Sequence, residues 1–312
     1  MGTTASGISV IFASVASGVA FACVAIGCAQ ILGAQFDDAQ LDAGGSTGTL
    51  DGAPGFDGDA SGAQDFDPRV LDHLVLWLAA DVGVTQTGLD AGIEPDGQSL
   101  PSNGVARWDD RSGAGHAALG TDPLHRPLLV RDASGREAGA PFLSFDRTAQ
   151  TCLSDTWSSV GAPQGLTLFV VAQGDPTDAL RFGPNGAIAF PWDANYARTQ
   201  GDQGELHLLV ETPTGLRATP LLGNPGPVPE VFSARLTARE IGGLRTYRNG
   251  QLTEQASLPD ADLPSLDALT LGCSPGADEF ATALVGEILL YTSALTDEDR
   301  LRVEAYLTAK WQ

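Results

Sequence analysis

Positive charge is scarce along this chain. Lys and Arg together number 17 against 39 Asp and Glu, the formal net charge is -22, and the single lysine is Lys310. A protein that binds nucleic acid needs basic side chains to neutralise phosphates. The composition therefore argues against nucleic acid as a partner, and against direct binding to anionic membrane surfaces.

Several motifs of catalytic chemistry are also missing. The chain has no G-x-S-x-G, no P-loop, no G-x-G-x-x-G after an expected strand and no C-x-x-C. Each of these motifs carries a defined chemistry. Their absence argues against acyl transfer on a hydrolase scaffold, nucleotide chemistry and thioredoxin-type redox chemistry.

Cysteine is sparse, and the four residues fall into two classes. Cys23 and Cys28 lie near the N-terminus, whereas Cys152 and Cys273 lie in the globular part. In an exported protein the second pair could form one disulfide, and closing so long a loop stabilises a fold by about 4 to 5 kcal/mol in the chain-entropy model. Two separate buried thiols that pack as small hydrophobes are the alternative.

The N-terminus lacks charge altogether. Residues 1–36 contain no charged side chain, and Ile8–Leu32 is a run of small and apolar residues, so we assign 1–34 to a leader or anchor. Ala25-Ile26-Gly27-Cys28 resembles a lipobox, which predicts lipidation of Cys28. A simple cleaved signal and an uncleaved anchor are the alternatives, in that order. We therefore expect an exported protein, either held at the envelope through this segment or its lipid, or secreted.

Residues 35–68 are predicted to form an acidic, disordered linker. The tract contains Asp, Gly, Ala, Ser and Thr but no basic residue, and it is too polar to offset its chain entropy by burial. Asp57-Gly58-Asp59 has the spacing of part of a calcium loop, but the further ligands and the terminal Glu are missing. No ligand set therefore supports calcium, and no metal or cofactor is predicted.

The remainder, residues 69–312, is rich in glycine and proline and modest in charge, a composition typical of short strands and tight turns. Leu74–Ala80 is a continuous apolar run, and Leu166–Ala172 lacks polar alternation, so both predict buried strands. Asn249-Gly250 suits the positive φ angles of a type I′ turn and predicts a hairpin. Further strands are expected at 205–211, 231–236 and 266–273.

In the C-terminal stretch, residues 284–311, the hydrophobic pattern changes from that of a strand to that of a helix. Leu284–Tyr291 predicts a buried strand, which we expect to pair with Leu74–Ala79. Thr296 is a suitable N-cap, and the acids after it complement the dipole of a helix that runs to Trp311. Glu287 is interpreted as a turn or cap residue.

These segments follow one another in a recognisable order. "LWL.AD.GV" begins at Leu76, "W.D.SG.G..A" at Trp108, and "GEILLYTSAL" at Gly286, with Arg126-Pro127 between them. In this order they resemble the LamG-like jelly-roll domains of the concanavalin A-like lectin/glucanase superfamily in bacterial exported proteins. The resemblance implies an all-β fold: a two-sheet antiparallel jelly-roll sandwich with a short C-terminal helix, over residues 69–312.

One stretch has the composition of a sugar site. Sugar sites pair an aromatic plate with side chains that bond hydroxyls. The candidate ligand-binding residues are Trp192, Asp193, Asn195, Tyr196 and Arg198. The alternative is a loop whose aromatic side chains cap the sandwich edge.

Two further sets of polar residues are weaker candidates for a catalytic or a metal site. Glycan hydrolases of the superfamily place two carboxylates on one strand, but Glu205 and Glu211 would lie about 20 Å apart, beyond glycosidase spacing. Asp109, Asp110 and His116 lie in a Gly-rich loop, where such residues more often hold a turn than bind metal. No catalytic residue is therefore predicted.

The function predicted from the sequence is a non-catalytic cell-surface or envelope protein. Its jelly roll would bind a glycan or a surface protein, or serve a structural role. A divergent glycan-active hydrolase of the same superfamily is the alternative.

Overall fold

The computed structural model describes residues 66–86, 104–131, 140–175, 179–183, 186–193, 206–212, 215–218, 221–223, 226–258, 262–276 and 279–312. All of them belong to one compact unit, Phe56–Gln312. The predictions for the leader, for Cys28 and for nearly all of the linker lie outside the described residues. Among the described residues, none of the helices has the length and apolar character needed to cross a membrane.

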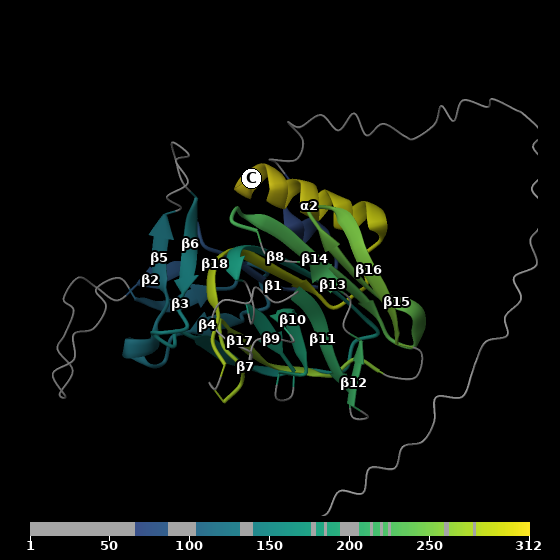
Figure 1. Ribbon diagram of the computed structural model, residues 1–312, viewed down its shortest axis with the longest axis horizontal. Coiled ribbons are helices and arrows are strands. Elements are labelled where there is room, and N and C mark those ends of the chain that lie inside the picture. The colour runs from purple at the N-terminus through teal and green to yellow at the C-terminus, as the bar shows by residue number, and fades with distance from the viewer. Residues whose placement is uncertain are drawn as a thin grey trace, which may run out of the picture. The chain divides into compact units, whose positions relative to one another are not determined.

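The chain forms two antiparallel sheets, which confirms the predicted all-β sandwich (Figure 1). The first sheet contains, in order, β16 (Gln251–Leu258), β15 (Glu240–Arg248), β14 (Glu230–Thr237), β8 (Gly165–Asp175), β18 (Thr282–Tyr291), β6 (Pro141–Phe145) and β5 (Leu128–Arg131), with β1 (Leu74–Ala79) also paired to β18.

The second sheet contains, in order, β12 (Gly215–Ala218), β11 (Leu206–Thr212), β10 (Ile188–Asp193), β9 (Leu180–Phe182), β17 (Leu266–Leu271), β7 (Leu153–Val160), β4 (Ala117–Leu119), β3 (Val105–Asp109) and β2 (Val84–Gln86), with β13 (Leu221–Gly223) also paired to β11. Two short 3₁₀ helices, η1 (Pro68–Val70) and η2 (Pro123–His125), lie in the connections.

Strands β8 and β18 form the middle of the first sheet, and their residues explain why. Leu166–Ala172 has no polar alternation, and every residue of that stretch is buried. A strand without alternation must be covered on both faces. The inner face packs against the second sheet, while α2 (Asp297–Trp311) covers the outer face (Figure 1).

Strand β18 joins the first and last parts of the domain. Its second half pairs with β1, with Leu74 opposite Tyr291 and Ala79 opposite Glu287, as predicted. Its first half pairs with β6 instead. The register changes near Gly286, where a Cβ atom would lie 2.9 Å from the Trp311 ring and 3.0 Å from the Phe142 ring. The absence of a side chain there lets Trp311 pack closely.

The predicted hairpin and helix cap are also confirmed. Asn249 and Gly250 have φ angles of 49° and 82° and connect β15 to β16. Thr296 is the N-cap of α2, and its Oγ1 accepts a hydrogen bond from the Asp299 backbone N–H at 3.1 Å.

Helix α2 is attached to the first sheet partly by buried ionic groups. Arg300 donates to Glu304 at 2.6 Å, and its guanidinium lies 3.7 Å from the centre of the Tyr247 ring. The hydroxyl of Ser233 donates to the other oxygen of Glu304. Burial raises the pKa of Glu304 above that of an ordinary glutamate, although the hydrogen bonds from Ser233 and Arg300 oppose the shift.

Glu287 is a second buried anchor, so its interpretation as a turn or cap residue is wrong. It lies within β18, its side chain is fully buried, and it accepts four hydrogen bonds. Its partners are the Trp77 indole at 2.5 Å, the Tyr306 hydroxyl at 2.9 Å, the Trp311 indole at 2.7 Å and the Lys310 ammonium at 2.8 Å. The carboxylate therefore connects β1, β18 and α2.

Candidate functional site

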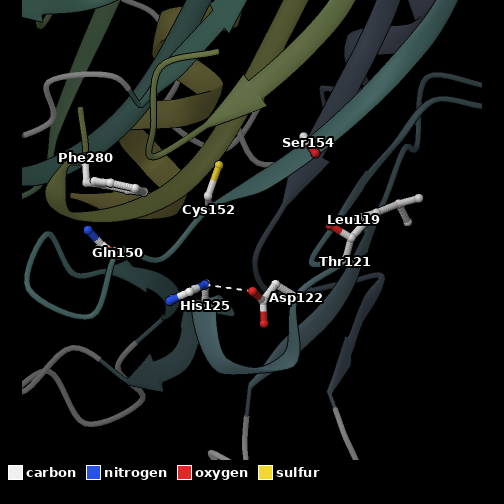
Figure 2. Close-up of a pocket in the computed structure, with 8 residues that line it drawn as sticks. All are labelled: Leu119, Thr121, Asp122, His125, Gln150, Cys152, Ser154 and Phe280. Atoms are coloured by element: carbon white, nitrogen blue, oxygen red, sulfur yellow. Dashed lines mark hydrogen bonds and ion pairs between the residues drawn. The ribbon is translucent and has the colours of Figure 1, made fainter. Parts of the chain in front are cut away.

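A cavity of about 300 Å³ lies on the second sheet, beside the only disulfide in the described part of the chain. Five of its lining residues offer hydrogen-bonding side chains, and an aromatic ring forms part of the wall (Figure 2). The lining residues are Leu119, Thr121, Asp122, His125, Gln150, Cys152, Ser154 and Phe280.

The short helix η2 presents Asp122 and His125 to the cavity. Asp122 is its N-cap, and Pro123 at the first helical position has the φ angle that a helix start requires. The Asp122 carboxylate accepts the Leu124 N–H at 3.0 Å and the His125 Nδ1 at 2.9 Å. The Leu124 hydrogen bond, followed by the His125 contact, holds the pKa of Asp122 below its usual value.

The contact with Asp122 also fixes the chemistry of His125. An imidazole that donates through Nδ1 to a carboxylate keeps Nε2 for another partner. Nε2 is therefore the ring nitrogen available to a bound molecule. In Figure 2, the His125 ring and Asp122 lie together at one end of the lining set.

The disulfide joins two walls of the cavity. Cys152 bonds to Cys273 with their Cα atoms 5.5 Å apart. On one side, the Cys152 N–H donates to the His125 carbonyl at 2.9 Å. On the other side, Cys273 forms an isolated antiparallel bridge with Phe280. The bond thus holds the η2 wall against the Phe280 wall.

Gln150 reaches the cavity from a tight turn after β6. The Asp146 carboxylate accepts the Thr148 N–H at 2.7 Å, and the Gln150 N–H donates to the Arg147 carbonyl at 3.2 Å. Gln150 itself has a φ of 55°, in the left-handed region. The turn, rather than a strand, therefore sets the position of the amide.

Ser154 lies on β7, where cross-strand pairing fixes its neighbours. It lies opposite Leu119 on β4 and opposite Thr270 on β17. Hydroxyl, amide, imidazole and carboxylate groups beside an aromatic ring are the combination that orients a small polyhydroxylated ligand. The cavity is therefore suited to binding one sugar-sized polar molecule.

The sugar site predicted from the sequence is only partly described. Trp192 and Asp193 end β10, opposite His207 and Leu206 of β11. The side chains of Trp192 and Asp193, and all of Asn195, Tyr196 and Arg198, lie outside the described residues. This candidate site stays a prediction.

In the loop after Trp108, the Asp110 side chain stabilises a turn. The Asp110 carboxylate accepts hydrogen bonds from the backbone N–H groups of Trp77 and Ser112, both at 2.8 Å, and from His116 at 3.2 Å. The His116 ring stacks on Trp157, with the ring centres 4.2 Å apart. These contacts favour the turn interpretation of the loop over a ligand site.

In the described part of the chain, acidic side chains and possible metal ligands do not cluster. Within the described ranges, no group of three or more His, Cys, Asp or Glu side chains could hold a metal ion. Glu211 is exposed on β11, and Glu205 lies outside the described residues. Asp122 is the single acid among the residues that line the cavity.

The cavity residues carried little signal in the sequence. Asp122-Pro123 is typical of a helix start, and that signal could have located η2. Gln150 and Ser154 are close in the chain, in a turn and at the start of β7, whereas Phe280 comes from a loop far along the sequence. Only the sheet pairing and the disulfide bring Phe280 to them.

The fold therefore defines a two-sheet β-sandwich with a small polar pocket. No family model matches the chain, and no curated protein matches it. Among solved structures, the chain is similar to Trypanosoma rangeli sialidase in complex with sialic acid (14% identity, TM-score 0.43, 76% of this chain and 33% of that chain). It is also similar to the binding domain of botulinum neurotoxin serotype G (8%, 0.46, 75% and 51%).

A third similar structure is the ligand binding domain of botulinum neurotoxin serotype D in complex with N-acetylneuraminic acid (9% identity, TM-score 0.42, 76% of this chain and 52% of that chain). The chain spans about a third of the sialidase and about half of the toxin domains. At these identities and TM-scores, the likeness assigns neither an activity nor a ligand to this chain.

Proposed function

We propose that this chain is a non-catalytic glycan-binding module of an exported envelope protein, and that one sugar unit occupies the pocket beside Cys152. The single observation that carries the proposal is the cavity of about 300 Å³ with its hydrogen-bonding side chains and the Phe280 ring. This volume is at the lower end of the range for small-molecule sites. It suits one ring of a longer chain rather than a large ligand.

The number of acids in the pocket favours binding over hydrolysis. A glycosidase places two carboxyl groups roughly 5 to 9.5 Å apart across the scissile bond. Asp122 is the single acid in the lining set, and its two oxygens already accept hydrogen bonds from Leu124 and His125. A divergent hydrolase remains the competing function, and the release of reducing sugar would reveal it.

Export to the envelope is part of the same proposal. It is supported by the uncharged N-terminal segment, with Cys28 as the lipidated residue, and by the bond between Cys152 and Cys273. Structural disulfides persist in oxidising compartments and are rare in the cytosol. Membership of the LamG-like jelly-roll domains is also part of this proposal, and it is supported by the order of the sequence motifs.

The test is a glycan array probed with the full chain and three variants. His125→Ala removes the imidazole, and Gln150→Gly removes the amide while tolerating the positive φ of that position. Gln255→Ala, at an exposed position of β16, is the control. We expect at least tenfold weaker binding for the two pocket variants and unchanged binding for the control.

The same array separates the competing sites and functions. Loss of binding in Trp192→Ala, with both pocket variants unaffected, would place the site at the end of β10 and overturn the pocket. Binding of no glycan by the wild-type chain would overturn the whole proposal. Reducing-sugar release that a single carboxylate substitution abolishes would establish the hydrolase instead.

A further inference from the structure

The lone lysine of the chain lies between two carboxylates. Lys310 Nζ is 2.9 Å from Asp81 Oδ1 and 2.8 Å from Glu287 Oε2. The Glu287 side chain is fully buried, whereas 21% of the Lys310 side chain and 38% of the Asp81 side chain are exposed. One nitrogen thus contacts a solvent-accessible acid and a buried acid at hydrogen-bond distance.

The three residues come from different parts of the fold. Asp81 follows β1, Glu287 lies in β18 and Lys310 is in the last turn of α2. The aromatic side chains of Trp77, Tyr306 and Trp311 donate to Glu287, and all three are at least nine-tenths buried. The cluster is therefore dry on the Glu287 side and open to solvent on the Asp81 side.

An ion pair alone does not require a lysine here. The chain has 16 arginines and one lysine, and arginines serve the other Lys/Arg ion pairs within the described ranges, such as Arg248 with Glu230. The two cations differ chemically, because a guanidinium stays protonated whereas a lysine can lose its proton and become a nucleophilic amine. Lysine thus stands at the position where an amine nucleophile could meet an acid.

We propose that Lys310 and Asp81 become joined by an intramolecular amide bond, with Glu287 as the group that accepts a proton from the Lys310 ammonium. The neutral amine attacks Asp81 Cγ, and the new bond is Nζ–Cγ. One Asp81 oxygen leaves as water, taking its two protons from the lysine nitrogen, one of them through Glu287. No redox change occurs, and no co-reactant is needed.

The geometry favours a reaction that is slow between free groups. Holding two reacting groups in contact gives effective molarities on the order of 10⁵ M or more in well-oriented cases. Here the Glu287 network fixes Lys310 from one side, and the partly exposed Asp81 lets the released water leave. The product would fasten the end of β1 to the end of α2.

The test is mass spectrometry of the full chain, reduced and then digested with trypsin. If the bond forms, Val70–Arg107 and Val303–Gln312 appear as one linked species, lighter than the two peptides by one water, because trypsin cannot cut at a modified Lys310. Recovery of separate Val70–Arg107 and Val303–Lys310, with no linked species after prolonged incubation of the folded chain, would show an ordinary salt bridge and overturn the proposal.

Three variants make the result specific. Lys310→Arg keeps the positive charge but has no nucleophilic amine, and Asp81→Ala removes the acceptor carbonyl, so both should lack the linked species. Glu287→Gln removes the proton acceptor, and we expect at least a tenfold lower fraction linked in the folded protein. A linked species in Lys310→Arg or Asp81→Ala that is lighter by one water than the sum of its two peptides would contradict the assignment of the two residues.

Discussion

The Glu287 carboxylate on β18 accepts a hydrogen bond from the Trp77 indole on β1 at 2.5 Å, across 210 positions of the sequence. Tyr306 and Trp311 of α2 donate to the same carboxylate. A buried carboxylate with this many donors is stabilised only while all of them stay in place. Through these contacts Glu287 holds β1 and α2 to β18 in the first sheet.

Removing this carboxylate should destabilise the fold strongly. Glu287→Ala leaves two indole N–H groups and the Tyr306 hydroxyl buried without their acceptor, and we expect a loss of about 3 to 5 kcal/mol in the free energy of unfolding. Urea denaturation measures it. The comparison belongs in the Lys310→Arg background, so that the proposed amide bond does not contribute.

Glu240→Ala is the control for that experiment, because Glu240 is an exposed glutamate on β15. It should change the free energy of unfolding by less than about 0.5 kcal/mol, as surface substitutions usually do. Equal effects of the two substitutions would contradict the structural role of Glu287.

Adding a single methyl group beside Trp311 tests the packing of α2. Gly286→Ala would place a Cβ atom 2.9 Å from the Trp311 ring and 3.0 Å from the Phe142 ring. Overpacking of this kind costs about 1 to 3 kcal/mol. Gly161→Ala, where a Cβ would meet nothing within 4 Å, is the matched control and should melt like the wild type.

The disulfide should matter for both stability and binding. Cys152→Ala with Cys273→Ala removes a link across 121 positions, and the chain-entropy model gives a loss of about 4 to 5 kcal/mol. The double variant should also bind glycan more weakly, because the bond joins the η2 wall to the Phe280 wall. Alkylation of Cys152 and Cys273 in the unreduced, denatured wild type, located by peptide mapping so that Cys23 and Cys28 do not count, would contradict the disulfide.

The buried Glu304 predicts a pH dependence of known sign. Burial raises the pKa of Glu304 in the folded state above its ordinary value of 4.5. The folded protein then binds the Glu304 proton more tightly than the unfolded chain does. The protonated Glu304 therefore contributes its full stabilisation below about pH 4.5, and this stabilisation is lost as the pH rises through the raised pKa of the folded state. Stability should fall with rising pH on account of this group.

Glu304→Gln isolates the effect, because glutamine cannot titrate but still offers an oxygen to Arg300. We expect the free energy of unfolding of the wild type to fall more steeply than that of Glu304→Gln between about pH 4.5 and 7. Denaturation in urea across that range measures the difference. Parallel pH profiles for the two proteins would refute the raised pKa.

Much of the fold could be predicted because its signals are local. The stretch Leu166–Ala172, which lacks polar alternation, predicted the buried β8. Asn249-Gly250 predicted the hairpin of β15 and β16, and Thr296 predicted the start of α2. The pairing of β1 with β18 was inferred from two apolar runs at the ends of the domain. Each of these signals is contained in a few adjacent residues.

The polar groups could not be predicted in this way. Glu287 appeared to be a turn or cap residue because a single acid in an apolar run gives no indication of its donors, which come from Trp77 and from α2. Gln150, Ser154 and Phe280 gave no signal because each belongs to a different element. Groups that act together through tertiary contacts require the sheet register before they can be recognised.

The proposed binding of one sugar unit of a glycan in the cavity beside Cys152 can be tested directly. The most direct measurement is the affinity of the wild-type chain, and of His125→Ala and Gln255→Ala, for the best ligand from the glycan array. We expect at least tenfold weaker binding for His125→Ala and equal binding for Gln255→Ala. Undiminished binding by His125→Ala together with Gln150→Gly would contradict it.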